Sequence, residues 1–425
     1  MNLTEEQQQI LNGSRGETMA KVLKTLVMYG DAFHAERMVP VTSSYGHLVT
    51  SFGLSMLSSV QSLMQELIDS GAVSSQPFSV DPRPLDPNVP SDPLQKAVFA
   101  FMYSKQKPYE EQLKKLGLMN PDAFTCTNYM PEVGNHPKEG DILSWAESSA
   151  VVYANSVLGA RCNRNSGIIE LFGSVAGCVP EFGLLTDEGR KASWIVEVRT
   201  THRPEAQLLG SAIGMKVMEE VPYVRGLDQW LGTELTQEAK DYLKDFGAAC
   251  ASNGAVGLYH IDHLTPEAVR LQDALIRPDA KTYVIDDAEL ERIHQSYPII
   301  WKNPDARPRL AFIGCPHLSL IQLQSWTERI RTALNRENRT RLAIPTVLTA
   351  APAVAAEFRN LPEYQALKRS GAVLSSICPL MYMNNPLCGG MPVITCSNKL
   401  RTYTTARYCT EDEILRWITK GGMQA

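Results

Sequence analysis

GCPHLSL, residues 314–320, marks a change from strand to helix in the C-terminal part of the chain. The apolar run before it, residues 309–313, is typical of a short strand. After it, apolar residues recur close to a helical period, at Leu320, Leu323, Trp326, Ile330 and Leu334. We therefore expect Cys315 and His317 at the tip of a strand, just before a helix. In open α/β sheets, ligands bind at such strand ends.

The same alternation of strand and helix continues toward the C-terminus. Further strand-like runs lie at residues 342–348, 372–377 and 392–395. Strands that alternate with helices predict a doubly wound, mostly parallel sheet, so residues 286–425 are predicted to form a C-terminal α/β domain. Cys315, Cys378 and Ser397 would then emerge at the same edge of that sheet.

The preceding part of the chain, residues 1–285, is predicted to be an N-terminal α/β region that can divide into two subdomains. Residues 194–198 and 255–261 look like two of its strands. Residues 75–93 contain six prolines, a density that excludes helix and central strand. We expect an extended arm that lies on the surface or on a partner. A plain semi-rigid connector is the alternative, and the favoured one.

The composition narrows the class of protein. A chain of 425 residues has room for two or three domains. Its formal net charge of −5 gives no bulk attraction to nucleic acid or to an anionic membrane. No apolar run approaches the roughly 20 residues that span a bilayer, and the polar N-terminus does not resemble a signal peptide. The nine cysteines contain no CxxC pair, so we expect reduced thiols in a cytoplasmic protein.

A second polar stretch, residues 122–167, carries candidate anion-binding groups. It contains TCTNY, a helix predicted over residues 147–158, and the loop ARCNRNSG, which holds Arg161 and Arg164. The guanidinium fork of arginine binds carboxylate or phosphate in a bidentate manner, so this loop suits a small anion. Alternatively, the two arginines only offset the dipole at a solvated helix end.

Three thiols could meet in one cleft. Cys126 lies in TCTNY, whereas Cys315 and Cys378 follow predicted strands. Three cysteines without a fourth suit an iron–sulfur centre that leaves one iron open to substrate. The wide spacing does not support this pattern by itself, and buried thiols are the alternative. A Cys315–His317 nucleophile is disfavoured, because residues i and i+2 across a proline point in different directions. Of the eight histidines, His47, His260 and His317 end or follow strands and are the better candidates.

The longer motifs resemble those of a known family. TCTNY, EVGN, SWAESSAVVYANSVLGARCNRNSG, EFGLLTDEGRKA, NGAVGLYHID, GCPHLSL and SNKLRTY together resemble the large, catalytic subunit of aconitase X, from about residue 20 to the C-terminus. The resemblance implies an aconitase-like fold of two or three α/β domains, with the active site in the cleft between them. It also implies a hydro-lyase, in which an iron centre acts as Lewis acid on the leaving hydroxyl.

The resemblance further implies roles for individual residues. Cys126 in TCT, Cys315 in GCPH and Cys378 in ICP would hold a 4Fe-4S or 2Fe-2S cluster, or a single iron. For the substrate, the candidates are Ser149, Arg161, Arg164 and Lys399. For catalysis, they are Glu147, His47 and Ser397. Each has a simpler alternative: Glu147 could cap a helix, His47 could be a satisfied loop histidine, and Lys399 could be a surface lysine.

The resemblance implies two substrates and one partner. The substrates are cis-3-hydroxy-L-proline, which gives a pyrroline carboxylate, and mevalonate 5-phosphate; the long blocks favour the first. The sequence departs from the family pattern at two places. Asn128 stands where close relatives often carry a further cysteine, which leaves Cys126 as the only possible ligand in TCTNY. TSSYGH lacks the expected histidine–glycine pattern, and this departure concerns the substrate. Because no swivelling domain is evident, we expect a separate small subunit that also supplies a serine for proton transfer. A non-catalytic, thiol-rich subunit is the alternative to an enzyme.

Overall fold

A five-stranded parallel sheet organises the C-terminal part of the protein in the computed structural model, which describes residues 1–49 and 58–422. Its strands are β9 (Leu310–Leu318), β10 (Thr346–Ala350), β11 (Val373–Ser375), β12 (Val393–Thr395) and β13 (Arg407–Tyr408). They lie in the order β11-β10-β9-β12-β13, and every neighbouring pair is parallel. The predicted α/β class, with a parallel C-terminal sheet, is confirmed.

Helices cover both faces of this sheet, as a doubly wound fold requires. Side chains alternate along β9, so Ala311 and Ile313 enter one apolar core while Leu310 and Phe312 enter another. The first core is closed by α13 (Leu320–Arg336), α14 (Pro352–Arg359), α15 (Pro362–Ser370) and α18 (Glu411–Lys420). The second is closed by α16 (Pro379–Met383), α17 (Asn398–Tyr403) and α4 (Pro93–Met102).

The GCPH motif lies inside the end of the central strand rather than beyond it. β9 runs through His317 to Leu318, but its pairing with β10 shifts register between Leu348 and Ala350. The following helix, α13, begins at once, because Ser319 and Gln322 form a capping box. Cys315 and His317 are therefore held in a buried, irregular strand end, immediately before a helix.

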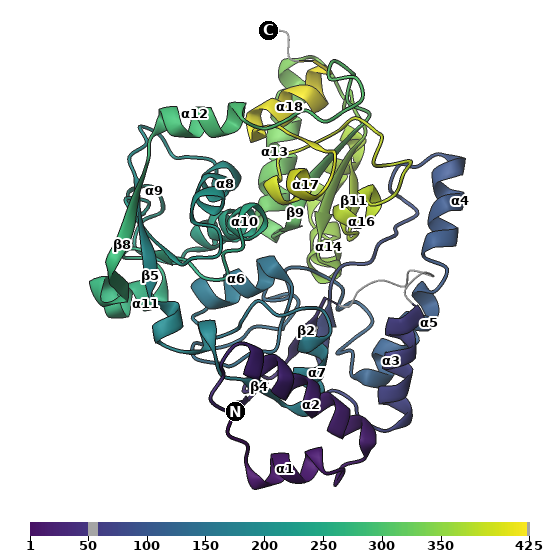
Figure 1. The fold of residues 1–425 in the computed structure, drawn as a ribbon. Helices are drawn as coiled ribbons and strands as arrows, with labels where there is room; N and C mark the ends of the chain where they lie inside the picture. The colour runs from purple at the N-terminus through teal and green to yellow at the C-terminus, as the bar shows by residue number, and fades with distance from the viewer. Residues whose placement is uncertain (50–57, 423–425) are drawn as a thin grey trace.

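A second parallel sheet precedes the first in the chain. It has the order β7-β6-β5-β8 and consists of β5 (Ala192–Val198), β6 (Pro222–Arg225), β7 (His260–Ile261) and β8 (Ile276–Ile285). Its helices are α8 (Ala206–Val217), α9 (Asp228–Leu231), α10 (Gln237–Asn253), α11 (Pro266–Leu271) and α12 (Asp287–Gln295). The strand expected over residues 255–261 is reduced to two residues. Figure 1 shows α8 and α10 between this sheet and the C-terminal one.

The N-terminal part is mostly helical, with two short strand pairs. Its helices are α1 (Glu5–Leu11), α2 (Glu17–Ala32), α3 (Ser58–Asp69), α5 (Gln106–Leu116), α6 (Ser148–Ser156) and α7 (Ile169–Ala176). Its strands are β1 (Met38–Pro40) with β4 (Cys178–Pro180), and β2 (Gly46–Leu48) with β3 (Phe78–Val80). Single 3-10 turns lie at Gly183–Leu185, Glu188–Arg190 and Gln272–Leu275. No helix in the described ranges is long and apolar enough to cross a membrane.

The proline-rich segment is a structural link and not a free arm. It begins with the buried strand β3, a strand that the proline count did not predict. The backbone carbonyl of Arg83 then accepts a hydrogen bond from the Cys378 N–H (2.9 Å), and Asp86 accepts one from the Ser375 hydroxyl (2.7 Å). Further along, the Tyr382 hydroxyl donates to the Pro90 carbonyl (2.6 Å). The segment thus ties the N-terminal part to the C-terminal sheet.

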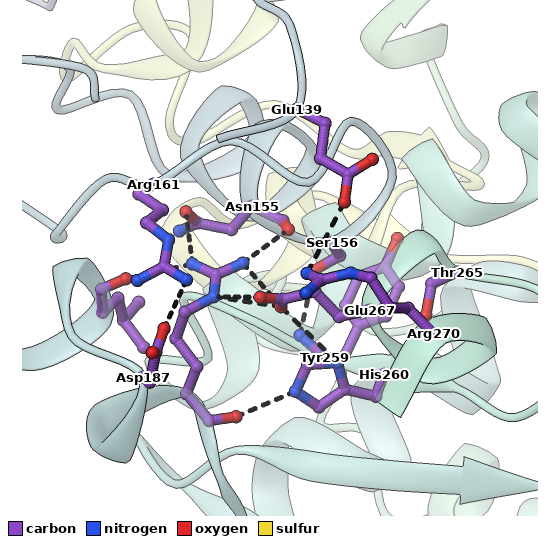
Figure 2. A network of polar contacts seen from close by, with 12 residues as sticks. Glu139, Asn155, Ser156, Arg161, Asp187, Tyr259, His260, Thr265, Glu267 and Arg270 are labelled. Carbon is purple, nitrogen blue, oxygen red and sulfur yellow. Dashed lines mark hydrogen bonds and ion pairs between the residues drawn. The ribbon is translucent and has the colours of Figure 1, made fainter. Parts of the chain in front are cut away.

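A buried ion pair ties the second sheet to the N-terminal part (Figure 2). The Arg190 side chain is 1% exposed, and its Nε and Nη2 donate to Glu267 at 2.8 Å. Nη2 also donates to the carbonyl of Asn155 in α6 (3.0 Å), and the Arg190 carbonyl lies 2.9 Å from His260 Nε2. Since Glu267 belongs to α11, the network joins elements that lie far apart in the sequence.

This network predicts unequal effects of two carboxylate substitutions. Glu267→Gln leaves the Arg190 cation buried without its counter-charge, which should cost about 3–5 kcal/mol of stability. Asp187→Asn removes the partner of Arg161, but Asp187 is 88% exposed, so its loss should cost about 1 kcal/mol at most. Urea unfolding of both variants beside the parent protein measures the difference. Equal losses of stability would contradict this account of the network.

Candidate active site

The three candidate cysteines come from three different elements, and Cys315 lies within electrostatic range of the other two. Cys315 is in β9, Cys378 caps α16, and Cys126 lies in the loop between α5 and α6. The charge of Cys315 acts on both other thiols. Burial raises the pKa of all three, to about 12 for Cys378. A positive partner is therefore needed to hold these thiols as thiolates near neutral pH.

A buried ion pair lies beside the thiols. Lys399, in the first turn of α17, pairs with Glu147 although both side chains are less than one-tenth exposed. Burial alone would lower the pKa of Lys399, but Glu147 and the nearby thiols Cys315 and Cys126 outweigh it and raise that pKa. Burial likewise opposes the ionised form of Glu147, yet Lys399 holds the pKa of Glu147 below its ordinary value. Both groups are therefore charged at neutral pH.

The ion pair also organises its surroundings. Glu147 Oε2 accepts the Ala150 N–H at 2.6 Å and so caps α6, as one sequence-based alternative proposed. Lys399 Nζ donates to Ser149 Oγ (2.8 Å), and Ser149 donates to Glu147 Oε1 (3.3 Å). Three of the predicted residues are thus in mutual contact, and Lys399 is not a surface lysine.

A histidine–aspartate pair lies on the N-terminal side of the site. His47, in β2, places its Nδ1 2.9 Å from Ser79 Oγ and its Nε2 3.5 Å from Asp81 Oδ1. Neither His47 Nε2 nor Asp81 Oδ1 has a good hydrogen bond within the described structure. Burial raises the pKa of Asp81 to about 6, and the Glu147 charge contributes to that rise.

Asp81 is the residue that the sequence analysis missed. It follows the buried strand β3, and its charge acts on Cys378. The sequence does carry a signal, namely an acid directly after the apolar run FSV at residues 78–80. That signal was hidden by the surrounding prolines, which led to the connector interpretation.

The two arginines of ARCNRNSG are in different environments. Arg161 donates to the Leu185 carbonyl (2.9 Å) and pairs with Asp187 (2.5 Å), in the network of Figure 2 and not among the thiols. Arg164 forms no hydrogen bond or ion pair with the residues that the structure describes. Burial lowers the pKa of Arg164, while the charges of Tyr403 and Glu147 oppose that shift. Arg164 is therefore the arginine that can receive an anion near Glu147.

Ser397 and Asn128 complete the candidates. The Ser397 hydroxyl donates to the Cys315 carbonyl and accepts the Leu400 N–H (3.1 Å), so it joins the start of α17 to β9. This engagement favours a structural role over the predicted catalytic one. Asn128, at the position where a further cysteine was expected, is fully buried, and neither atom of its amide has a protein partner in the described part of the chain. A buried amide of this kind requires a water or ligand partner.

His317 and His260 are both buried and neutral. Burial lowers the pKa of each to about 4. His317 Nδ1 lies 3.0 Å from Thr125 Oγ1, and its Nε2 lies 3.1 Å from the Ile377 carbonyl. Because both ring nitrogens are engaged, His317 cannot serve as the base of a Cys315 nucleophile. His260 belongs to the network of Figure 2, and its Nε2 lies 2.9 Å from the Arg190 carbonyl.

The candidate thiols do not form a ready-made site for a single ion within the described residues. Among the described residues, no group of three or more His, Cys, Asp or Glu side chains is arranged to hold a single metal ion. A single ion collects its ligands at one centre, whereas a cluster spreads them over several iron atoms. Three thiolate donors suit either kind of iron centre.

Comparison with known proteins was made by sequence and by structure. Models for the first and second domains of aconitase X match residues 1–188 and 192–295. The phosphomevalonate dehydratase large subunit of Thermococcus kodakarensis is 31% identical over 383 residues, which is 89% of each chain. Cis-3-hydroxy-L-proline dehydratase of Hypocrea jecorina is 30% identical over 67% of this chain and 46% of its own length. The crystal structure of holo-form aconitase X from Thermococcus kodakaraensis matches with a TM-score of 0.80 and 28% identity, over 98% of this chain and 100% of that one.

The ion pair predicts a pH-dependent loss of stability in Lys399→Met. Without the cation, burial should raise the pKa of Glu147 above its value in the unfolded chain. The folded variant then binds a proton that the unfolded chain releases, so its stability falls as the pH rises from about 5 to about 8. At neutral pH the loss should be about 3–5 kcal/mol.

The double variant Glu147→Gln/Lys399→Met is the matched control for this effect. It lacks the titrating carboxyl, so it should be more stable than Lys399→Met at neutral pH and lose less stability between the two pH values. Urea unfolding across this pH range compares the two. Parallel pH profiles would show that Glu147 is not the group that responds.

Proposed function

The chain belongs to the aconitase X family, and from that premise we propose that it is the catalytic subunit of a dehydratase, a hydro-lyase that removes water from a small hydroxy acid. The observation that carries this proposal is the meeting of three thiols with the buried Lys399–Glu147 pair. The phosphomevalonate and cis-3-hydroxy-L-proline dehydratases among its relatives support the reaction type.

The proposed cofactor is an iron–sulfur cluster held by Cys126, Cys315 and Cys378. When bound, such a centre acts as a Lewis acid on the leaving hydroxyl group. Two features support iron at this place: three thiols lie beside the Lys399–Glu147 pair, and burial raises their pKa values, so bound positive charge would stabilise the thiolates. Lys399 supplies part of that charge from the protein.

The remaining residues are proposed to bind the acid and to move protons. Arg164 would pair with the substrate carboxylate, since its guanidinium has no protein partner within the described structure. Asp81, with a pKa of about 6, exists in both protonation states near neutrality, and this is what proton transfer requires. His47, whose Nε2 faces Asp81, would orient that carboxyl. Glu147 stays ionised and holds Lys399 and Ser149 in place.

The proposed substrate is cis-3-hydroxy-L-proline, with a pyrroline carboxylate as product. Arg164 lies near Glu147 and forms no ion pair with the described residues. Its one positive charge matches the one carboxylate group of this substrate. Mevalonate 5-phosphate is the second candidate, because a relative that carries its name aligns over 89% of both chains. An assay of both compounds by NMR, with the small subunit present, distinguishes the two. Turnover of neither, by iron-loaded protein, would contradict the dehydratase.

The proposed partner is a small subunit that carries the swivelling domain. The names of the phosphomevalonate dehydratase relatives support a partner, since these proteins are called large subunits. A separate domain that closes over the thiols would exclude water and add the serine that the family resemblance implies. A heteromer in the cytoplasm remains our prediction for the working enzyme.

Cysteine replacement tests the cofactor. Cys315→Ser should lose the bound iron and the visible absorbance after anaerobic reconstitution, because an alcohol does not replace a thiolate as a ligand at neutral pH. Cys250→Ser is the matched control, since Cys250 is also buried but lies in the core around α10. Iron analysis and spectroscopy of both variants provide the comparison. Full iron content in Cys315→Ser would exclude Cys315 as a ligand.

The two neighbouring arginines test substrate binding. Arg164→Met should lower kcat/KM by about 10- to 100-fold, chiefly through KM, because one charge-assisted hydrogen bond to the carboxylate is lost. Arg161→Met should leave KM near that of the parent, since Arg161 is occupied by Asp187 and the Leu185 carbonyl. Steady-state kinetics of the two variants decide the matter. A larger rise in KM for Arg161→Met than for Arg164→Met would place the substrate carboxylate at Arg161.

A further inference from the structure

One imidazole touches all three segments that carry the candidate cysteines. His317 is 1% exposed and lies two residues after Cys315 in β9. Its Nδ1 is 3.0 Å from the hydroxyl of Thr125, the residue before Cys126. Its Nε2 is 3.1 Å from the carbonyl of Ile377, the residue before Cys378. The His317 backbone N–H also donates to Cys126 Sγ at 3.5 Å.

The partners of the ring fix its tautomer. The Ile377 carbonyl can only accept, so the proton lies on Nε2 and Nδ1 accepts the Thr125 hydroxyl hydrogen. Thr125 Oγ1 in turn accepts the Thr127 N–H (3.0 Å), and the Thr127 hydroxyl lies 3.1 Å away as a second donor. Every ring nitrogen therefore has a partner, and the direction of each hydrogen bond is determined.

The backbone around the ring is fixed as well. The ammonium group of the fully buried Lys244, in α10, donates to the His317 carbonyl (2.8 Å) and to Gln322 Oε1 (2.5 Å). On the other side, the Ser397 hydroxyl donates to the Cys315 carbonyl. The strand end cannot shift without breaking these bonds. The ring is therefore a fixed point for two loops that otherwise pair with residues 80–83, Thr125 with Val80 and Cys378 with Arg83.

We propose that His317 is a positioning residue, which sets the spacing of Cys126 and Cys378 relative to Cys315 before any iron binds. The proposal rests on the proposed function only in that these thiols are the iron ligands. The spacing itself belongs to the protein and can be measured without iron. His317 does not contact substrate or transfer a proton in this role.

Two substitutions separate the two arms of the ring. Asparagine places an amide oxygen near the position of Nδ1, so His317→Asn retains an acceptor for Thr125 but cannot reach the Ile377 carbonyl. Glutamine places an amide near Nε2, so His317→Gln retains the donor to Ile377 but offers Thr125 no acceptor at the right place. His260→Gln is the matched control, because His260 is a buried neutral histidine that also faces a backbone carbonyl, that of Arg190.

The measurement is the rate at which dithionitrobenzoate modifies each thiol in the full-length, iron-free protein, followed by mass spectrometry of the peptides. His317→Gln should speed modification of Cys126, and His317→Asn that of Cys378, each by about tenfold, the factor expected for one lost buried hydrogen bond. His260→Gln should change neither rate. Anaerobic reconstitution should give less iron per chain in both His317 variants than in His260→Gln.

Equal acceleration of both thiols in both His317 variants, or the same effect in His260→Gln, would overturn the proposal, because His317 would then only support the fold.

The Thr125 variants provide the test if the His317 variants do not fold. Thr125→Val should accelerate modification of Cys126 alone, and Thr125→Ser should keep the parent rate. Parent rates in Thr125→Val would also overturn the proposal. If the parent protein binds no iron, the proposed cofactor fails. The thiol rates still decide the positioning role in that case.

Discussion

The ion pair between Lys399 and Glu147 is the constraint on which the site depends. Its partners lie 252 positions apart, in the first turn of α17 and at the cap of α6. Removing two charges from water costs several kcal/mol per ion, so such a pair persists only where other bonds satisfy both groups. Ala150 and Ser149 provide those bonds. The pair thus joins the C-terminal sheet to the N-terminal part and leaves a fixed cation beside the thiols.

The same site brings together pieces of the N-terminal part and of the C-terminal sheet. β9 carries Cys315, the loop before α6 carries Cys126, and the proline-rich segment carries Asp81 and binds the backbone of Cys378 through Arg83. Because prolines have no N–H to donate, this segment makes few internal hydrogen bonds, and its carbonyls remain free for the C-terminal sheet. An irregular segment is therefore suited to crossing between these two parts of the protein.

Local patterns predicted the C-terminal half well and the site unevenly. Strand and helix periods are short-range signals, so the parallel sheet and the strand-end cysteines could be derived from them. The difference between Arg161 and Arg164 could not, because it depends on Asp187 and Glu147, which come from other elements. Asp81 was missed for the opposite reason: the prolines around it were a strong local signal that concealed the buried strand β3. Where the long-range partner decides a side chain's role, sequence spacing carries little information.

The charge balance of the site explains why it requires something beyond the chain. Lys399 is matched by Glu147, and Arg164 is available for an anion, so three thiolates would bring negative charge that the described residues do not neutralise. Burial therefore keeps the thiols protonated in the protein alone. Iron bound by the thiolates would displace those protons and supply the missing positive charge. The buried groups of Asn128, His47 and Asp81 have the same implication, because each has a polar atom without a hydrogen-bond partner among the residues that the structure describes. The protein thus holds the three thiols and the Lys399 cation in place, and bound ligands would supply the partners that are still missing.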